Sequence, residues 1–217
     1  MNILEQIAYC VEFGKINKAA PFPPDLKGQN GADELTKQAL EEGISPDDIL
    51  QKSFVSAMNK VGRKFSENKI FVPQMLMSAK AMSTGMEHLK PFFQSGEVQR
   101  KGKFVIGTVS GDLHDIGKNL VAMMIEGAGW EVIDLGVDVK TDKFMNELSE
   151  DSNCIIGLSA LLTTTMVNME DTVKQIKEKH PNTRIIIGGA PVTEDFKNKI
   201  GASFYAPSPQ EAVEFLG

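Results

Sequence analysis

Residues 104–119 read FVIGTVSGDLHDIGKN, an apolar run that passes directly into a polar, glycine-containing loop. The run is rich in β-branched residues and almost continuously hydrophobic, as expected for a strand that is covered on both faces. Helical segments separate it from similar short runs at 131–135, 154–158, 184–187 and 203–205. Strands that alternate with helices predict a doubly wound, parallel five-stranded α/β domain. Ligands of such domains bind beyond the carboxyl ends of the strands, so the loops after these runs form the candidate site.

Residues 1–93 follow a different pattern, in which apolar side chains recur at three- and four-residue spacing. This period predicts amphipathic helices, and we expect four of them, the last over residues 72–90. Ser45 is expected to cap the third helix, because a proline and two aspartates follow it. Residues 20–31 are expected to form an irregular loop. The polar segment 94–103 is expected to link this helical domain, residues 1–93, to the α/β domain, residues 104–217.

Composition and charge argue against several classes of protein. The chain has 23 Lys and Arg against 29 Asp and Glu, with a net charge of −6, which disfavours a nucleic-acid footprint. No apolar run approaches the ~18–20 residues that span a bilayer, and the N-terminus lacks the pattern of a signal peptide. The cysteines, Cys10 and Cys154, fall in different domains, so no disulfide is expected. These features predict a cytoplasmic protein that binds neither nucleic acid nor a membrane.

The loop after the first strand carries the residues most suited to metal chemistry. A neutral imidazole such as that of His114 is a good ligand for a transition metal, and a carboxylate on its other nitrogen fixes the tautomer. Asp112, two residues earlier, can point toward the same region, and Gly117 lets the next helix begin close to a bulky ligand. The alternative interpretation is a solvated turn in which Asp112 or Asp115 caps the helix.

The spacing Asp-x-His-x-x-Gly resembles the signature of the cobalamin-binding domain, which methionine synthase, corrinoid methyl-transfer proteins and some B12-dependent mutases share. The resemblance implies a flavodoxin- or Rossmann-like fold for the α/β domain. It also implies that His114 is the lower axial ligand of cobalt, in place of the cofactor's own dimethylbenzimidazole, whose nucleotide tail lies in a slot inside the sheet. The surrounding loop residues are implied to contact the cofactor: Gly111, Asp112, Leu113, Asp115 and Gly117.

The loop after the third strand resembles the Ser-x-Leu element of the same family. Ser159 can donate a hydrogen bond to the buried benzimidazole nitrogen, and Leu161 can pack against its ring. Thr163 falls at the place of a second hydroxyl contact. Thr165 falls where the family has the hydroxyl that continues the relay from the histidine and the aspartate, although serine is frequent there. The alternative is a helix N-terminus capped by Thr163 or Thr164.

The loops after the fourth and fifth strands complete the resemblance. Gly188 and Gly189 resemble the Gly-Gly element at which the nucleotide tail passes close to the backbone. Tyr205 lies where the family closes the pocket for the tail. A plain strand-to-loop turn is the alternative for the two glycines, but three matching loops at one edge of the sheet favour the cofactor site.

Residues 61–74 of the helical half resemble the junction between the third and fourth helices of a four-helix cap found in methionine synthase and corrinoid methyl carriers. The resemblance implies that Phe65 and Val72 cover the methyl group above cobalt. Family members often carry leucine at the second position, so valine makes a thinner lid. The alternative is that both side chains are ordinary core residues of a helical bundle. The polar connector 94–103 would be the hinge by which such a cap moves.

The resemblance implies a corrinoid carrier subunit that is not itself a catalyst. Such a subunit alternates between cob(I)alamin and methylcob(III)alamin. Its expected partners are a substrate-specific methyltransferase, an acceptor methyltransferase and a reductive activator of cob(II)alamin. The methyl donor is a methylamine, an aromatic methyl ether or methanol, and the acceptor is coenzyme M or tetrahydrofolate. No residue of the chain chooses between them.

Three other functions remain open from the sequence. A B12-dependent sensor or regulatory protein also places a helical bundle before a cobalamin domain, but residues 1–100 show no basic recognition helix. The cobalamin subunit of a mutase is disfavoured by the cap junction. A response regulator without cobalamin would need an acidic site at the strand ends, which Asp112, Asp115 and Asp134 could mimic.

Overall fold

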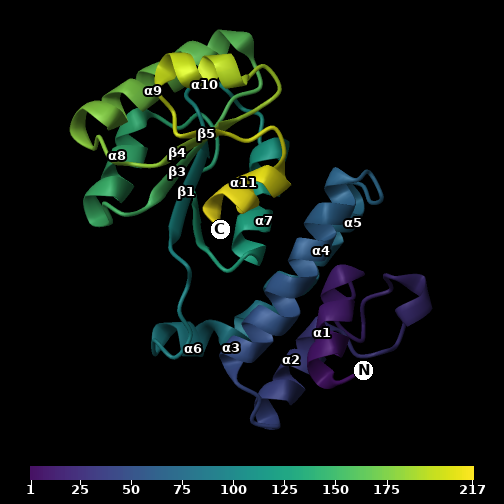
Figure 1. Cartoon of the computed structure of the whole chain (residues 1–217). Helices are drawn as coiled ribbons and strands as arrows, with labels where there is room; N and C mark the ends of the chain where they lie inside the picture. The colour runs from purple at the N-terminus through teal and green to yellow at the C-terminus, as the bar shows by residue number, and fades with distance from the viewer. The chain divides into compact units, whose positions relative to one another are not determined.

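The computed structural model describes all residues from Met1 to Gly217. The chain forms two compact units (Figure 1). The first, the helical unit, comprises Met1–Arg100 with Gly127–Gly129. The second, the α/β unit, comprises Lys101–Glu126 and Trp130–Gly217. No helix in either unit is long and apolar enough to cross a membrane.

The helical unit contains the four expected helical stretches, and the third of them is continuous from residue 46 to residue 66. The fourth extends slightly beyond its predicted end through two short additions. The elements are α1 (Ile3–Glu12), η1 (Pro24–Leu26), α2 (Ala32–Glu41), α3 (Pro46–Asp48), η2 (Ile49–Val55), α4 (Ser56–Ser66), α5 (Val72–Met86), η3 (Glu87–Leu89) and α6 (Lys90–Gln94).

Local sequence sets where these helices begin. Asn2 caps α1: its side chain accepts from the Glu5 backbone N–H, and the Glu5 side chain accepts from the Asn2 backbone N–H, each at 2.9 Å. Ser45 occupies the expected cap position of α3, but its side chain accepts no hydrogen bond, so this part of the prediction was wrong. The start of α3 depends instead on Pro46, whose fixed φ suits the first helical position.

The core of the helical unit forms where α1 packs against α2, η2, α4 and α5. Its buried side chains come from all of these helices, and η2 is a π-helix that the sequence pattern did not indicate. Within η2, the Ser53 hydroxyl donates to the Leu4 carbonyl at 3.0 Å, which ties the π-helix to α1. Members of this core include Ile7, Val11, Leu35, Phe54, Met58, Val61, Met75 and Met82.

The α/β unit is built on a five-stranded, wholly parallel sheet, as predicted. Its strand order is β2-β1-β3-β4-β5. The strands are β1 (Lys103–Thr108), β2 (Glu131–Asp134), β3 (Ile155–Ser159), β4 (Ile185–Gly188) and β5 (Phe204–Tyr205).

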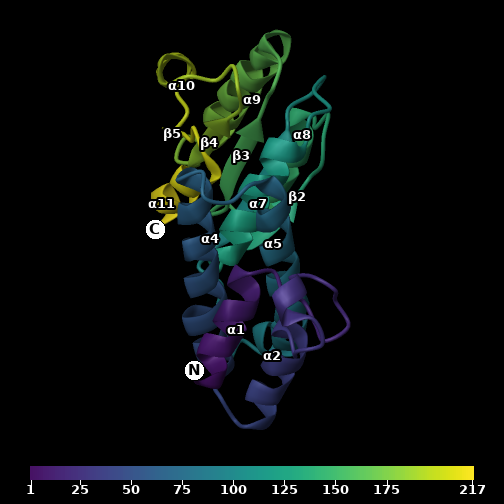
Figure 2. The same ribbon diagram turned by 90° about the vertical axis from the view of Figure 1, so that its right-hand side faces the viewer.

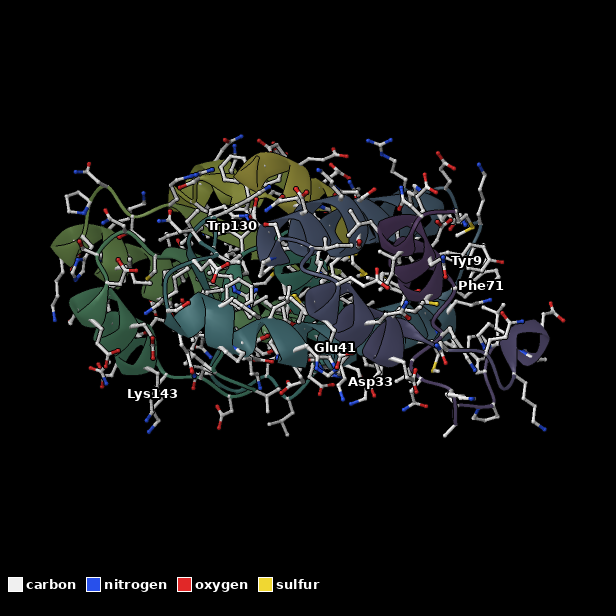
Figure 3. All side chains as sticks on the ribbon, turned by 90° about the horizontal axis from the view of Figure 1, so that it is seen from below. Tyr9, Asp33, Glu41, Phe71, Trp130 and Lys143 are labelled. Atoms are coloured by element: carbon white, nitrogen blue, oxygen red, sulfur yellow. The ribbon has the colours of Figure 1, made fainter.

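Helices cover both faces of this sheet (Figures 1 and 2). The helices α8, α9 and α10 lie on one face, and α7 and α11 lie on the other. The first face holds a core cluster that includes Val105, Phe144, Ile156, Val173 and Ile187. On α8, the exposed Lys143 is adjacent to the buried Phe144 (Figure 3). The helical elements are α7 (Ile116–Gly127), α8 (Thr141–Glu150), η4 (Thr163–Thr165), α9 (Met166–Lys179), α10 (Glu194–Ile200) and α11 (Pro209–Leu216).

The order of the strands places the candidate loops together. From β1 the chain adds β2 on one side, and β3, β4 and β5 follow on the other side. In open parallel sheets a crevice forms where the strand order reverses, outside the carboxyl ends of the strands. Here that point lies between β1 and β3, so the loops that follow Thr108 and Ser159 meet there.

Candidate functional site

His114 and Asp112 form a hydrogen-bonded pair in the loop between β1 and α7. The His114 Nδ1 atom lies 2.7 Å from Asp112 Oδ1, and the His114 backbone N–H donates to the same oxygen at 3.1 Å. The Asp112 side chain is fully buried, whereas the His114 side chain is 49% exposed. The buried carboxylate therefore holds one edge of an imidazole whose other edge is open to a ligand.

The second oxygen of Asp112 is held by the loop after β3. The backbone N–H groups of Leu161 and Leu162 donate to Oδ2 at 2.8 and 3.2 Å, and the Thr165 hydroxyl lies 2.8 Å from it. Burial alone would raise the pKa of Asp112, but the hydrogen bonds from Leu161, His114 and Thr165 outweigh it and hold the pKa well below its usual range. Asp112 is therefore a carboxylate throughout the physiological pH range.

This arrangement selects one tautomer of His114. Because an ionised carboxylate only accepts hydrogen bonds, the proton of the neutral ring lies on Nδ1, and Nε2 carries the free lone pair. The loop that bears the ring is anchored as well, since the Thr108 hydroxyl donates to the His114 carbonyl at 2.9 Å. A histidine prepared in this way can bind a metal ion through Nε2.

Asp138, in the loop after β2, supports the same loop, although the sequence analysis did not single it out. Its Oδ1 accepts from the Gly111 backbone N–H at 2.7 Å and from the Ser110 hydroxyl at 3.2 Å. These two hydrogen bonds lower the pKa of Asp138. Its own backbone N–H donates to the Asp112 carbonyl at 3.0 Å. Asp138 takes a left-handed backbone conformation, with φ of 52°, which no residue pattern indicated.

Three further polar contacts, made by Asn168 and Lys118, were also missed by sequence reasoning. The Asn168 side chain, on α9, donates to the Ser110 carbonyl at 2.7 Å. The buried Lys118 forms an ion pair with Asp134 at the end of β2 and donates to Asn119 Oδ1 at 2.7 Å. Lys118 and Asn119 directly follow the histidine motif, and this adjacency is the only signal in the sequence that could have identified them.

The acidic residues at this edge do not form an open cluster. Asp112 is enclosed by backbone and side-chain donors, and Asp134 is paired with Lys118. Asp115 Oδ2 accepts from the Asn119 side chain at 3.1 Å. Three carboxylates with separate partners do not resemble the shared acidic site that a response regulator would need.

A row of small residues crosses the sheet beside this loop. Thr108 pairs with Ser159, and Ser159 pairs with Gly188, so the three lie side by side on the face that α7 and α11 cover. A Cβ atom on Gly188 would lie 3.2 Å from the Ala206 carbonyl oxygen. The row, Thr108–Ser159–Gly188, therefore carries only small side chains at the carboxyl edge of this face of the sheet.

Two features require glycine at position 189, its backbone conformation and its close approach to Ala160. Its φ is 131°, and a Cβ atom there would lie 1.8 Å from the Ala160 carbonyl oxygen. No L-residue with a side chain fits this place without a shift of the backbone. The close approach brings the loops after β3 and β4 together.

Large apolar side chains are exposed in the loops that follow β1 and β3. Leu113 is 72% exposed and Ile116 is 69% exposed in the loop after β1, and Leu161 is exposed in the loop after β3. A Cβ atom added to Gly117 would meet no other atom within 4 Å. Thr163 is exposed on η4. The two loops that hold the His114–Asp112 pair thus expose apolar side chains at the carboxyl edge of the sheet.

Tyr205 is not brought to the same face of the sheet as Ser159 and Gly188. Its side chain packs against the core cluster on the side of α8, α9 and α10. Phe204, the preceding residue, faces the other side and stacks on Phe215 of α11, with ring centroids 4.3 Å apart. Any part of Tyr205 in a slot on the α11 side would therefore be its backbone.

In the helical unit, Phe65 near the end of α4 and Val72 at the start of α5 are both half-buried. Phe71 between them is 64% exposed (Figure 3). The turn that joins the two helices includes Asn68 in a left-handed conformation, with φ of 55°. Phe65 and Val72 are thus not fully enclosed core residues.

Comparison with known proteins identifies the family. Residues 102–214 match a family model described as a B12 binding domain, and residues 29–90 match a second model with the same description. The chain is 42% identical to trimethylamine corrinoid protein 1 of Methanosarcina acetivorans, over 84% of this chain and 86% of that protein. The chain belongs to the corrinoid methyl-carrier proteins of methyltransferase systems.

Solved structures of corrinoid proteins have the same fold as this one. The methanol:cobalamin methyltransferase complex from Methanosarcina barkeri matches with a TM-score of 0.81 and 28% identity, over 98% of this chain and 77% of that one. A cobalamin-binding protein from Desulfitobacterium hafniense matches with a TM-score of 0.72 and 28% identity, over 98% of this chain and 96% of that one. The predicted fold class, a helical cap followed by a Rossmann-like domain, is confirmed.

The cofactor of this corrinoid protein is cobalamin, and the residues at the carboxyl edge fit it. A free imidazole nitrogen suits cobalt, and the apolar side chains exposed in the loops after β1 and β3 suit a corrin macrocycle. The small side chains of the row Thr108–Ser159–Gly188 suit a ligand that passes close to the backbone.

Proposed function

We propose that this corrinoid protein carries methyl groups from a substrate-specific methyltransferase for a methylated amine to a second, acceptor methyltransferase, with His114 as the lower ligand of cobalt. Bound cobalamin supplies the cobalt that accepts and releases the methyl group. The protein supplies the ligand, the enclosure and the surface that partner enzymes recognise. The proposed acceptors are coenzyme M or tetrahydrofolate, and a reductive activator is proposed to restore oxidised cofactor.

The geometry of His114 carries this proposal. Its Nδ1 is bound to the buried Asp112 carboxylate, which leaves Nε2 free and exposed at the reversal point of the sheet. Asp112 is in turn bound to Thr165, so a ligand on Nε2 is coupled through the ring to a network that spans the loops after β1 and β3. A carboxylate behind the imidazole raises its basicity and strengthens the bond to a metal.

The other residues predicted from the sequence are likewise proposed to contact or enclose the cofactor. Ser159 and Gly188 border the slot proposed for the nucleotide tail, and Gly189 lets the loops close around it. Leu113, Leu161 and Thr163 are proposed to contact the cofactor at the open edge. Phe65 and Val72 of the helical unit are proposed to shield the methyl group. Of the predicted linker 94–103, Gln94 belongs to α6 and Lys103 to β1, so residues 95–102 are proposed as the linker.

The choice of a methylated amine as the donor follows from the relatives. Trimethylamine corrinoid protein 1 and dimethylamine corrinoid protein 1 of Methanosarcina acetivorans are each 42% identical to the chain. The matching chain of the methanol:cobalamin methyltransferase complex from Methanosarcina barkeri is 28% identical. The equal identity to the trimethylamine and dimethylamine proteins does not separate the two amines, so the proposal extends to the class.

The test is a methyl-transfer assay with reduced holoprotein. Trimethylamine, dimethylamine and methanol are each supplied with their own methyltransferase, and methylation is followed by the absorbance of the corrinoid. We expect methylation with an amine methyltransferase at a rate at least ~10-fold above that with the methanol enzyme. Preference for methanol would overturn the assignment of the donor.

A further inference from the structure

The last helix presents a polar residue to the sheet. Gln210, Val213 and Leu216 of α11 are spaced three residues apart, and all three are buried. This spacing places them in one stripe along the helix. Phe215 of α11 stacks on Phe204, so α11 covers the face of the sheet that carries Phe204.

Gln210 lies in the first turn of α11, on the same face and at the same edge of the sheet as the row of small residues. Because α11 follows β5 almost directly, its first turn lies at the carboxyl edge of the sheet. Ser159 and Gly188 lie at the same edge and on the same face, and the Ala206 backbone extends the row toward α11. Gln210 is therefore the buried polar side chain of α11 nearest to the row of small residues.

The amide of Gln210 has one satisfied end and one unsatisfied end. Its Nε2 donates to Glu214 Oε1 at 3.0 Å, and its Oε1 is buried without a hydrogen-bond partner. A carboxylate accepts only, so Glu214 fixes the orientation of the amide and leaves the oxygen inside. Gln210 is 8% exposed, and a buried acceptor without a partner is rare enough in native proteins to require an explanation.

We propose that Gln210 Oε1 accepts a hydrogen bond from a ribose hydroxyl of the nucleotide tail, and that Gln210 thereby adds selectivity for corrinoids that carry a tail. The inference rests on the proposed use of the slot for that tail. An amide oxygen needs a donor, and among the parts of the tail the ribose hydroxyls donate, whereas the benzimidazole nitrogen and the phosphate accept. Binding of the tail would give Gln210 Oε1 the hydrogen-bond donor that it lacks in the cofactor-free protein.

A second orphaned atom provides a matched control. The Thr183 hydroxyl is also buried without a partner, but Thr183 precedes β4 and so lies at the amino edge of the sheet. Gln210→Leu and Thr183→Val each remove one unpaired buried polar atom with little change in size. Both variants are expected to raise the melting temperature of the cobalamin-free protein, because an unsatisfied polar group is removed from the interior.

The experiment compares two ligands by absorbance titration of the cobalamin-free full-length chain. One is cobalamin, and the other is cobinamide, a corrinoid that lacks the nucleotide tail. We expect the parent protein to bind cobalamin more tightly than cobinamide. Gln210→Leu should weaken cobalamin binding about tenfold and leave cobinamide binding unchanged, whereas Thr183→Val should match the parent with both ligands. Gln210→Met repeats the test in case the leucine variant does not fold.

The possible failures are distinguishable. If the parent binds both corrinoids equally, the slot does not hold a tail and the wider proposal fails with this one. If the parent prefers cobalamin and both Gln210 variants keep that full preference, only the role of Gln210 is overturned. If a Gln210 variant lost as much affinity for cobinamide as for cobalamin, the role of Gln210 would also be overturned, because the lost contact would then not be with the tail.

Discussion

Asp112 is the residue on which the geometry of the site depends most. Its charge is fully buried and has no cation beside it, so backbone N–H groups, an imidazole and a hydroxyl stabilise it. Charge-assisted hydrogen bonds of this kind are about twice as strong as neutral ones. Asp112 Oδ1 sets the tautomer of His114, and Asp112 Oδ2 binds the loop after β3, so one carboxylate both positions the histidine and joins the loops after β1 and β3.

Replacing the histidine tests the ligand directly. His114→Ala should abolish the nitrogen splitting in the electron paramagnetic resonance spectrum of the cob(II)alamin-loaded protein and should weaken cobalamin binding. The fold should be little affected, because half of the side chain is exposed. His180→Ala, in the same unit but before β4, is the control and should keep the splitting. A splitting that survives in His114→Ala would show that the ligand is another group.

Replacing the carboxylate tests the residue behind the ligand. In Asp112→Asn the amide can offer an oxygen to Leu161 and Thr165 only by turning its NH₂ group toward His114, which disfavours the Nδ1–H tautomer. We expect cobalamin affinity to fall by ~10–100-fold and the histidine-bound fraction to decrease, with the pH dependence of that fraction shifted. The measurement is the absorbance of the bound cofactor across pH. Unaltered affinity and pH profile would remove Asp112 from the relay.

The low pKa of Asp112 also predicts how stability depends on pH. In the unfolded chain an aspartate titrates near ~3.9, and in the native protein Asp112 titrates lower. The unfolded state therefore binds more protons in this range, and the contribution of Asp112, present above about pH 4, is lost as the pH falls through the native pKa. The urea midpoint of the parent should fall more steeply between pH 5 and pH 3 than that of Asp112→Asn. Parallel curves would contradict this.

At the level of secondary structure, the site depends on how closely the loops after β3 and β4 approach. The contact between Gly189 and the Ala160 carbonyl leaves no space for a Cβ atom. Ala160 is the first residue after β3, and the two amides that hold Asp112 follow it immediately. A shift at Gly189 therefore reaches the aspartate through the loop after β3.

Gly189→Ala is expected to destabilise the protein by about 2 kcal/mol or more, because it adds both a collision and backbone strain. Gly201→Ala is the control: Gly201 has a φ of 74° but open space around it, so it adds strain without a collision and should cost about 1 kcal/mol. Urea unfolding measures both values. Equal losses of stability in the two variants would show that the loops after β3 and β4 can move apart and avoid the collision at no cost.

At the level of the whole molecule, the groups available for chemistry are few and mostly engaged. Burial raises the pKa of the Cys10 and Cys154 thiols to about 11, so neither is a thiolate at neutral pH. In the helical unit, His88 Nε2 lies 2.7 Å from Asp33 Oδ1. Activation of a methylated amine needs an acid or Lewis acid at the leaving nitrogen, so we expect the partner enzyme to supply it.

The corresponding prediction concerns turnover. Reduced holoprotein alone, with trimethylamine or dimethylamine at millimolar concentration, should show no methylation of the cofactor above background. Addition of the substrate-specific methyltransferase should allow methylation, and addition of an acceptor methyltransferase should allow repeated turnover. The assay follows corrinoid absorbance and methylated acceptor in parallel. Sustained turnover by the chain alone would make it an enzyme in its own right.

The hydrophobic runs and the Asp-x-His-x-x-Gly motif were enough to predict the fold class and the cofactor. All five strands were placed within one or two residues, because buried parallel strands are short, apolar and bounded by turn residues. The pairing of His114 with Asp112 was also predictable, since side chains two residues apart in an extended loop can point to the same region. Local spacing indicates the strands and this pairing, whereas the cofactor followed from the resemblance of the motif to that of the cobalamin-binding family.

The tertiary structure alone revealed which distant residues support the site. Asp138 and Asn168 reach the loop after β1 from the loop after β2 and from α9, and Lys118 of α7 pairs with Asp134 of β2. Sequence spacing does not report such contacts between elements. The sequence also could not predict which face of the sheet Tyr205 and Gln210 lie on, because this depends on the register of β5 and on the packing of α11. Parallel strands that are distant in the chain share one edge of the sheet, and that edge exists only after the fold has closed.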